Sequence, residues 1–184
     1  MKLKIRSGVF ETNSSSMHSV ALLNRKNCMT ASLGEALEED ERMGFHDGNI
    51  TFHSEADLQF GWGFQIVDTF YGRLAYALAS YGKDSLDAVV EAVHSIFPEV
   101  HGIELPTDSY SGEKTSGYLD HESYGTLQCH LSENGLILSD FLADRNTIII
   151  IDNDNNCVFE DIVRCGILDR DAVKNIDKIS GGDM

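Results

Sequence analysis

The chain has 184 residues, of which 42% are hydrophobic and 24% are charged. This balance excludes a disordered chain and predicts one globular domain over residues 1–184 with a core of ordinary size. No apolar run approaches the roughly 18 to 20 residues that a membrane-spanning helix needs, so no contact with a membrane is expected.

The formal net charge is −16, and it is unevenly distributed. Five cationic residues against the single Glu11 make residues 1–26 net +4, which leaves −20 for residues 27–184. An anionic field of this size repels nucleic acid and favours solubility or docking onto a basic surface. Direct contact with nucleic acid is therefore expected only through the basic N-terminal strand.

The cysteines and the N-terminus indicate the compartment. The four cysteines contain no C-x-x-C pair, which favours reduced thiols over a disulfide framework or a zinc ribbon. The N-terminus has no long apolar segment before a small-residue cleavage site, so no signal peptide is expected. Together these features predict a cytoplasmic protein.

A Ser-rich loop between two strand patterns is the first element. Residues 2–6 alternate as in a strand, residues 18–23 read as a second one, and the pair predicts a β-hairpin. Such a loop either satisfies its own turn or presents several donors to a bound anion. The candidate anion-binding residues are Arg6, Asn13, Ser14, Ser15, Ser16 and His18.

A helix is expected next, over residues 33–43. Ser32 stands three residues before Glu35, which is the spacing of a capping box. Four consecutive acids inside this segment form either a solvated helix face or a contact surface for a basic partner. These candidate partner-binding residues are Glu38, Glu39, Asp40 and Glu41. A turn at Asp47-Gly48 then leads into a strand at 50–53.

Two amphipathic helices follow an aromatic segment at 60–64, which is expected to close the core or to serve as a stacking platform. Apolar residues recur at three- and four-residue steps over 66–81 and again over 86–97. Gly82 ends the first helix and Pro98 ends the second, so they form a helical hairpin. Asp84 and Asp87, at the mouth of this hairpin, extend the candidate partner-binding surface.

The residue pattern of the remaining chain is typical of short strands and turns. Strands are expected at 100–105, 127–131, 147–151 and 157–159, and helices from residue 139 and over 169–179. The β-branched segment 147–151 belongs in the middle of a sheet, and residues 152–156 are expected to turn the chain back. A flexible segment is predicted at about 107–117 and a frayed tail at 180–184. The fold class is α+β, with a mixed or antiparallel sheet packed against the helical hairpin.

Three residue patterns are candidates for catalytic sites. D-x-D at 152–154 matches the start of metal-dependent phosphatases, but too little chain follows it, so a turn is the better interpretation. Asp120, His121 and Glu122, joined by His18 or His130, could bind a metal or transfer protons, although neighbours on a strand point to opposite faces. Ser16 and His18 lack the strand–turn–helix context of a nucleophile elbow. No metal, cofactor or catalytic residue is therefore expected.

Three short blocks carry a resemblance to known proteins. They are R-S-G-V-F-E-T-N-S-S-S-M-H-S at 6–19, Y-L-D-H-E-S at 118–123 and I-I-I-I-D-N-D-N at 148–155. The chain resembles proteins encoded by phages and prophages of Gram-positive bacteria and, more loosely, anti-CRISPR inhibitors of the type II effector nuclease. This resemblance implies a role in the bacterial host cytoplasm and assigns no catalytic residue.

The leading expectation is thus a phage-encoded acidic protein that inhibits a host defence nuclease by occupying its basic nucleic-acid-binding surface, as a DNA mimic does. One alternative is a small metal-dependent phage hydrolase or nucleotide-modifying enzyme that uses His18, Asp120 and His121. Another is a structural or regulatory phage protein with the Ser-rich loop as its interaction element. The oligomeric state stays open.

Overall fold

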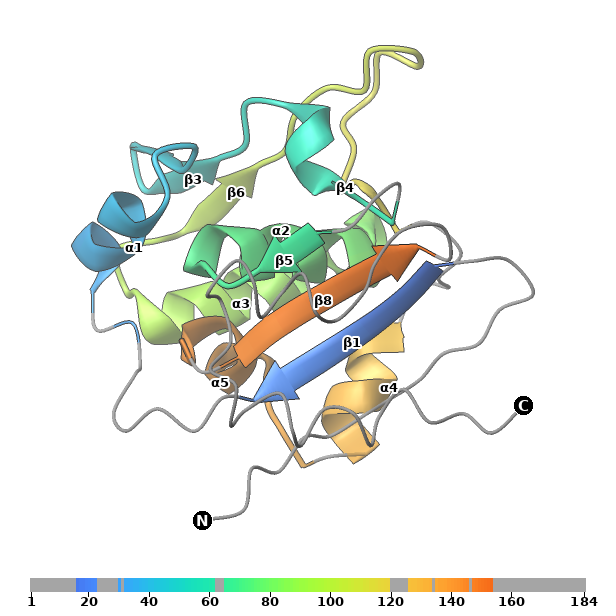
Figure 1. Ribbon diagram of the computed structural model, residues 1–184. Helices are drawn as coiled ribbons and strands as arrows, with labels where there is room; N and C mark the ends of the chain where they lie inside the picture. Colours follow the sequence, from blue (N-terminus) through green and yellow to red (C-terminus); the bar gives the residue numbers. More distant parts are fainter. Residues whose placement is uncertain are drawn as a thin grey trace, which may run out of the picture.

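The computed structural model describes residues 16–22, 30, 32–61, 65–119, 126–133, 135–145 and 147–153 (Figure 1). Within these residues, short helices and small open sheets form an α+β fold, which confirms the fold class expected from the sequence. The strands expected at 2–6 and 157–159, the helix at 169–179, the tail at 180–184 and Trp62 lie outside the described residues.

The longest strands form an antiparallel sheet in the order β1-β8-β5, made of Ser16–Leu22, Thr147–Asn153 and Gln65–Val67. The central position predicted for residues 147–151 is confirmed, because β8 pairs with β1 on one side and with β5 on the other (Figure 1). The turn expected from residue 152 is wrong for its first two residues. Asp152 and Asn153 continue β8 because Met17 and Ser16 of β1 pair with them.

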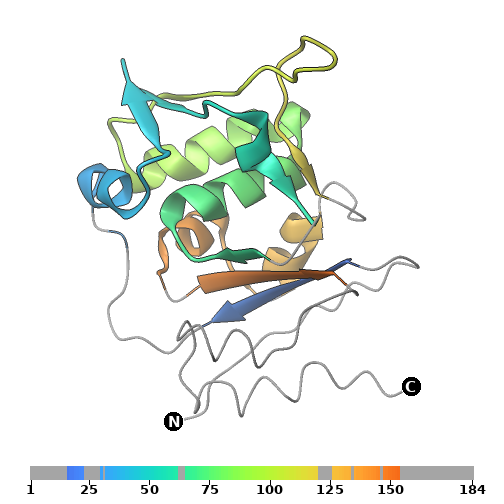
Figure 2. The same cartoon turned by 45° about the horizontal axis from the view of Figure 1, so that its top comes forward.

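Two smaller sheets lie on the other side of the helices (Figure 2). Strands β2 (Gly44–His46) and β3 (Asn49–Thr51) form a hairpin through Asp47-Gly48, whose positive φ angles of 48° and 80° suit a two-residue turn. Strand β3 pairs in parallel with β6 (Gly102–Glu104), and β4 (Gln59–Phe60) pairs in parallel with β7 (Tyr118–Leu119). The expected mixed sheet is therefore present.

The described helices in chain order are α1 (Leu33–Glu39), η1 (Glu55–Leu58), α2 (Phe70–Tyr81), η2 (Lys83–Ser85), α3 (Leu86–Ile96), α4 (Thr126–Glu133) and α5 (Leu138–Ala143). Among these described helices, only α2 and α3 are longer than eight residues. Ser32 caps α1 as predicted, since its Oγ accepts a hydrogen bond from the Glu35 N–H. The helical hairpin of α2 and α3 is confirmed, and α5 is the helix expected from residue 139.

Three element boundaries correct the sequence expectation. Helix α1 ends at Glu39 and not at residue 43, because Asp40 adopts an extended backbone. Helix α2 begins at Phe70 and not at residue 66, because residues 65–67 join the sheet as β5 and Thr69 caps the helix. The strand expected at 127–131 is helical, and the four-residue step from Leu127 to Leu131 buries both leucines on one face of α4.

Helix α2 is the centre of the fold. It lies between the β1-β8-β5 sheet and α3 in Figure 2, and every residue from 70 to 80 is buried. A helix surrounded on all sides is not amphipathic, so the single apolar face expected from the periodicity is wrong. The fully buried Arg73 joins three elements: its Nε donates to the Leu142 carbonyl at 2.9 Å, and Nη1 donates to the carbonyls of Asp68 and Thr147.

Candidate functional site

The four consecutive acids expected to form one binding surface are divided by the fold. Glu38 and Glu41 are exposed, whereas Glu39 and Asp40 turn toward the start of α2. A carboxylate oxygen of Glu39 accepts a hydrogen bond from the N–H of Phe70 at 2.7 Å, and Asp40 accepts one from the Thr69 hydroxyl at 3.1 Å. The expectation of a continuous acidic contact surface is therefore corrected. The unpaired N–H groups and the positive end of α2 draw two of the four carboxylates inward.

Asp40 also forms the best-connected ion pair of this region. It accepts hydrogen bonds from the Nε and Nη2 atoms of Arg42, and the Arg42 guanidinium lies over the ring of Tyr71. Burial opposes ionisation of Asp40, but the hydrogen bonds and charge of Arg42 outweigh it, so the pKa of Asp40 lies below its ordinary value of 3.8. A lowered carboxyl pKa stabilises the folded state above pH 3.8, and this contribution is lost as the pH falls through the lowered value.

We expect Asp40→Asn to lower the free energy of unfolding at pH 7 by about 2 kcal/mol, because Arg42 and Thr69 lose a charged acceptor. Urea unfolding at pH 7 and near pH 3 measures the effect. The difference from the wild type should shrink at the acidic pH, where the wild-type carboxyl is increasingly protonated. The exposed Glu41→Gln is the matched control, with a change within about 0.5 kcal/mol. A difference that is the same at both pH values would show that the charge of Asp40 has no such role.

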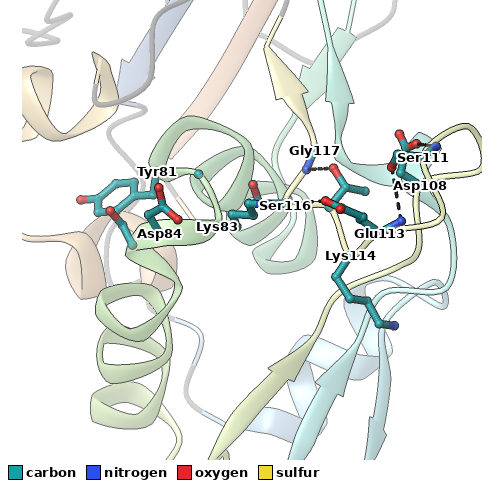
Figure 3. A pocket seen from close by; sticks show the side chains of 12 residues that line it. Tyr81, Lys83, Asp84, Asp108, Ser111, Glu113, Lys114, Ser116 and Gly117 are labelled. Atoms are coloured by element: carbon teal, nitrogen blue, oxygen red, sulfur yellow. Dashed lines mark hydrogen bonds and ion pairs between the residues drawn. The ribbon is translucent and has the colours of Figure 1, made fainter.

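A pocket with a volume of about 480 Å³ lies where α2 passes into α3 (Figure 3). One wall is the junction of these helices, with Tyr81, Lys83 and Asp84, and the other is the hairpin at residues 106–117. In Figure 3, Tyr81 and Asp84 lie on one side and Asp108, Ser111 and Glu113 lie on the other. Lys83 connects the two walls, since its Nζ lies 3.8 Å from a carboxylate oxygen of Glu113.

Hydrogen bonds shape the hairpin at 106–117. Thr107 and Lys114 form an isolated bridge, and the carboxylate of Asp108 accepts from the backbone N–H groups of Ser111 and Tyr110. These bonds, that of Ser111 first, hold the pKa of Asp108 below its ordinary value. The tip carries Tyr110, whose side chain is 100% exposed. The mobility expected for about 107–117 stays a prediction, which amide hydrogen exchange would measure.

An acidic row begins in η2, at the rim of this pocket, and continues along the outer face of α3. Asp84, Asp87 and Glu91 are all exposed, and steps of three and four residues place them on one face. The opposite face of α3 buries Val89 and Val93 in the core. Within the described part of the chain, none of the three acids has an ion pair or a hydrogen bond. We call these three residues the α3 acidic row.

Sequence reasoning found two members of the α3 acidic row and missed the third. Asp84 and Asp87 were candidates because they stand at the mouth of the helical hairpin, and the structure places Asp84 in η2 and Asp87 in the first turn of α3. Glu91 was missed, although its position four residues after Asp87 on a predicted helix was a sufficient signal.

The pocket offers charge and hydrogen bonding. Its described lining supplies carboxylates, hydroxyls and the two ammonium groups of Lys83 and Lys114, and it includes no histidine or cysteine. Lys114 Nζ donates to the Leu105 carbonyl at 2.7 Å. A paired nucleophile and base of the kind that acyl transfer requires is not among these lining residues.

The other candidate residues are placed only in part. Arg6, Asn13, Ser14, Ser15, Asp120 and His121 lie outside the described residues. Ser16 and His18 belong to β1, where they pair with Asn153 and Ile151, so the expectation that Ser16 is a loop residue is wrong. The length of β8 explains this difference, because its last residues extend the ladder to Ser16. Among the described residues, no three metal-ligating side chains gather around one point.

Comparisons of this chain with protein-family models, curated proteins and solved structures find no match. No helix in the described ranges combines the length and the apolar character that crossing a membrane requires.

Proposed function

We propose that this protein is an acidic binding protein that docks through the α3 acidic row onto a basic surface of a host protein. The observation that carries the proposal is the exposure of Asp84, Asp87 and Glu91 on one helix face without a cationic partner in the described structure. Carboxylates held this way create a local negative field, and they can accept charged hydrogen bonds from lysine and arginine side chains.

The partner that we propose is a host defence nuclease, of the type II CRISPR effector class that the phage resemblance suggests. Such a nuclease holds its guide–target duplex in a positively charged channel through the phosphate backbone. Asp87 and Glu91 are about 6 Å apart along the axis of α3, and Asp84 precedes Asp87 by three residues in η2. A nucleic-acid strand carries one charge per roughly 3.4 Å. A row of carboxylates on a comparable scale supports competition for the same cationic groups.

In this proposal the basic N-terminal residues have a different role from the α3 acidic row. Residues 1–26 are net positive while the rest of the chain is net negative, so any direct contact with nucleic acid would use this end. The α3 acidic row would then contact the protein partner. The pocket beside Asp84 supports docking as well, because a side chain of the partner can enter it next to the row.

The test neutralises the α3 acidic row with Asp84→Asn, Asp87→Asn and Glu91→Gln in one variant. We expect its affinity for a guide-loaded type II effector nuclease to fall by at least about tenfold, because electrostatic complementarity is lost. Its binding should also depend less steeply on salt than that of the wild type between about 50 and 150 mM, because surface charges become increasingly screened over this range. Biolayer interferometry and a DNA-cleavage assay measure binding and inhibition.

The matched control removes three exposed carboxylates elsewhere, through Glu38→Gln, Glu41→Gln and Glu99→Gln. Its charge change is identical, so a loss specific to the α3 acidic row separates local docking from a general effect of net charge. Equal losses in both variants would contradict the assignment of the row. A wild-type protein that neither binds nor inhibits the nuclease would overturn the proposed partner.

A further inference from the structure

Two histidines meet at the end of α3 remote from the pocket. His94 belongs to the last turn of α3 and His101 directly precedes β6. The centres of their rings are 5.6 Å apart, with an angle of 44° between the ring planes, and both residues are exposed. Neither residue belongs to a pattern that the sequence singled out, because seven positions and the end of a helix separate them.

The backbone holds both histidines in place. The Phe97 N–H closes α3 on the Val93 carbonyl, and the Val100 N–H donates to the Phe97 carbonyl at 2.9 Å across the turn that contains Pro98. The His101 N–H then donates to the Gly48 carbonyl at 2.7 Å in the β2–β3 turn. The two imidazoles are therefore brought together by a closed turn between a helix and a strand, and not by a free loop.

The hydrogen bond of His94 determines which of its nitrogens is available. Its Nδ1 lies 2.8 Å from the carbonyl oxygen of Val100. A carbonyl oxygen only accepts, so Nδ1 carries the proton and Nε2 keeps its lone pair. Histidines that bind metals commonly donate their other ring N–H to a backbone carbonyl, which fixes the tautomer and the ring orientation in the same way.

The separation of the rings matches that of two imidazoles on one ion. With metal–nitrogen bonds of about 2.1 Å, each ring centre lies roughly 3.2 Å from the metal, and bond angles between tetrahedral and trigonal place the two centres about 5 to 6 Å apart. The observed 5.6 Å falls in this range. Both rings are open to solvent, so water can complete the coordination.

We propose that His94 and His101 form a two-histidine site for a divalent transition-metal ion that prefers imidazole, such as Zn²⁺, Ni²⁺ or Cu²⁺. Two protein ligands make this an exchangeable site and not a closed structural centre of four ligands. The ion would connect the end of α3 to the start of β6 and so stabilise the folded state. This proposal does not depend on the proposed function, because neither histidine belongs to the α3 acidic row, although Glu91 precedes His94 by one helical turn.

The test titrates the untagged, metal-free full-length protein with Ni²⁺ and Zn²⁺ by isothermal titration calorimetry. We expect His94→Gln and His101→Gln each to weaken binding by at least about tenfold, which is the smallest effect usual even for residues that only support a ligand. The double variant should lose little more than either single one, since the two imidazoles act as a unit. Circular dichroism verifies that each variant is folded.

His46→Gln and His53→Gln are the matched controls, because both histidines are exposed and belong to the same end of the molecule. Their affinity for the ions should equal that of the wild type. A second measurement adds trace Cu²⁺, which should broaden the ring-proton resonances of His94 and His101 before those of His46. Unchanged affinity in both ligand variants, or no binding to the wild type at millimolar ion, would overturn the proposal.

Discussion

Replacing Arg73 with alanine is expected to lower the free energy of unfolding by about 4 kcal/mol, the scale of removing one partner from a buried charged network. The side chain has 0% exposure, and its donors reach the carbonyls of Leu142, Asp68 and Thr147. These bonds connect α2 to α5, to the segment after β5 and to β8. Alanine would leave a cavity and three carbonyls, two of them buried, without this donor, and urea unfolding at pH 7 measures the loss.

Two further substitutions separate the contributions of side-chain volume, charge and hydrogen-bond geometry to this loss of stability. Burial lowers the pKa of Arg73 to about 10, and within the described structure its Nη2 has no hydrogen-bond partner, so the buried charge itself has a cost. Arg73→Met keeps most of the volume and removes the charge, and we expect a loss of about 2 kcal/mol from the unpaired carbonyls. Arg73→Lys keeps the charge but not the planar arrangement of donors. An unchanged unfolding midpoint in the alanine variant would contradict the central role of Arg73.

Gly117→Ala is expected to lower the free energy of unfolding by about 3 kcal/mol through backbone strain and steric overlap. Gly117 has a φ of +96°, and a β-carbon there would overlap the carbonyl oxygen and side chain of the fully buried Leu58. The overlap would separate β7 from β4 and release the adjoining wall of the pocket. Faster amide exchange over residues 115–119, together with a lower urea midpoint, would verify this.

Gly112→Ala is the matched control for Gly117. Gly112 also has a positive φ, of +72°, but nothing lies within 4 Å of the position that its β-carbon would occupy. Only the strain of the left-handed backbone remains there, at about 1 kcal/mol. Equal losses in the two variants would show that contact with Leu58 does not contribute, which would contradict the close approach at Gly117.

Local patterns in the sequence were sufficient for several elements. Ser32 followed by Glu35 predicted the start of α1, and the apolar repeats with Gly82 and Pro98 predicted the hairpin of α2 and α3. The run of β-branched residues predicted that β8 is central. These predictions succeeded because caps, helical periodicity and β-branched runs act within a few residues of one another, so the chemistry that decides them is contiguous in the chain.

The sites depended on contacts that no local pattern contains. The acids at residues 38–41 look like one exposed surface in the sequence. In the structure, the start of α2, some thirty residues later, donates the Phe70 N–H to Glu39 and the Thr69 hydroxyl to Asp40. In the sequence, Arg73 is only a polar position on a predicted helix. In the structure it is buried, because α5 and β8 supply carbonyl acceptors from roughly seventy residues away. His94 and His101 become neighbours only when the turn after α3 closes. The sequence by itself therefore determined the elements whose signals are local, such as α1, the α2–α3 hairpin and β8, but not α4 or β5. Only the tertiary structure decided which charges are exposed, because a charged side chain becomes buried wherever distant backbone groups satisfy it better than water does.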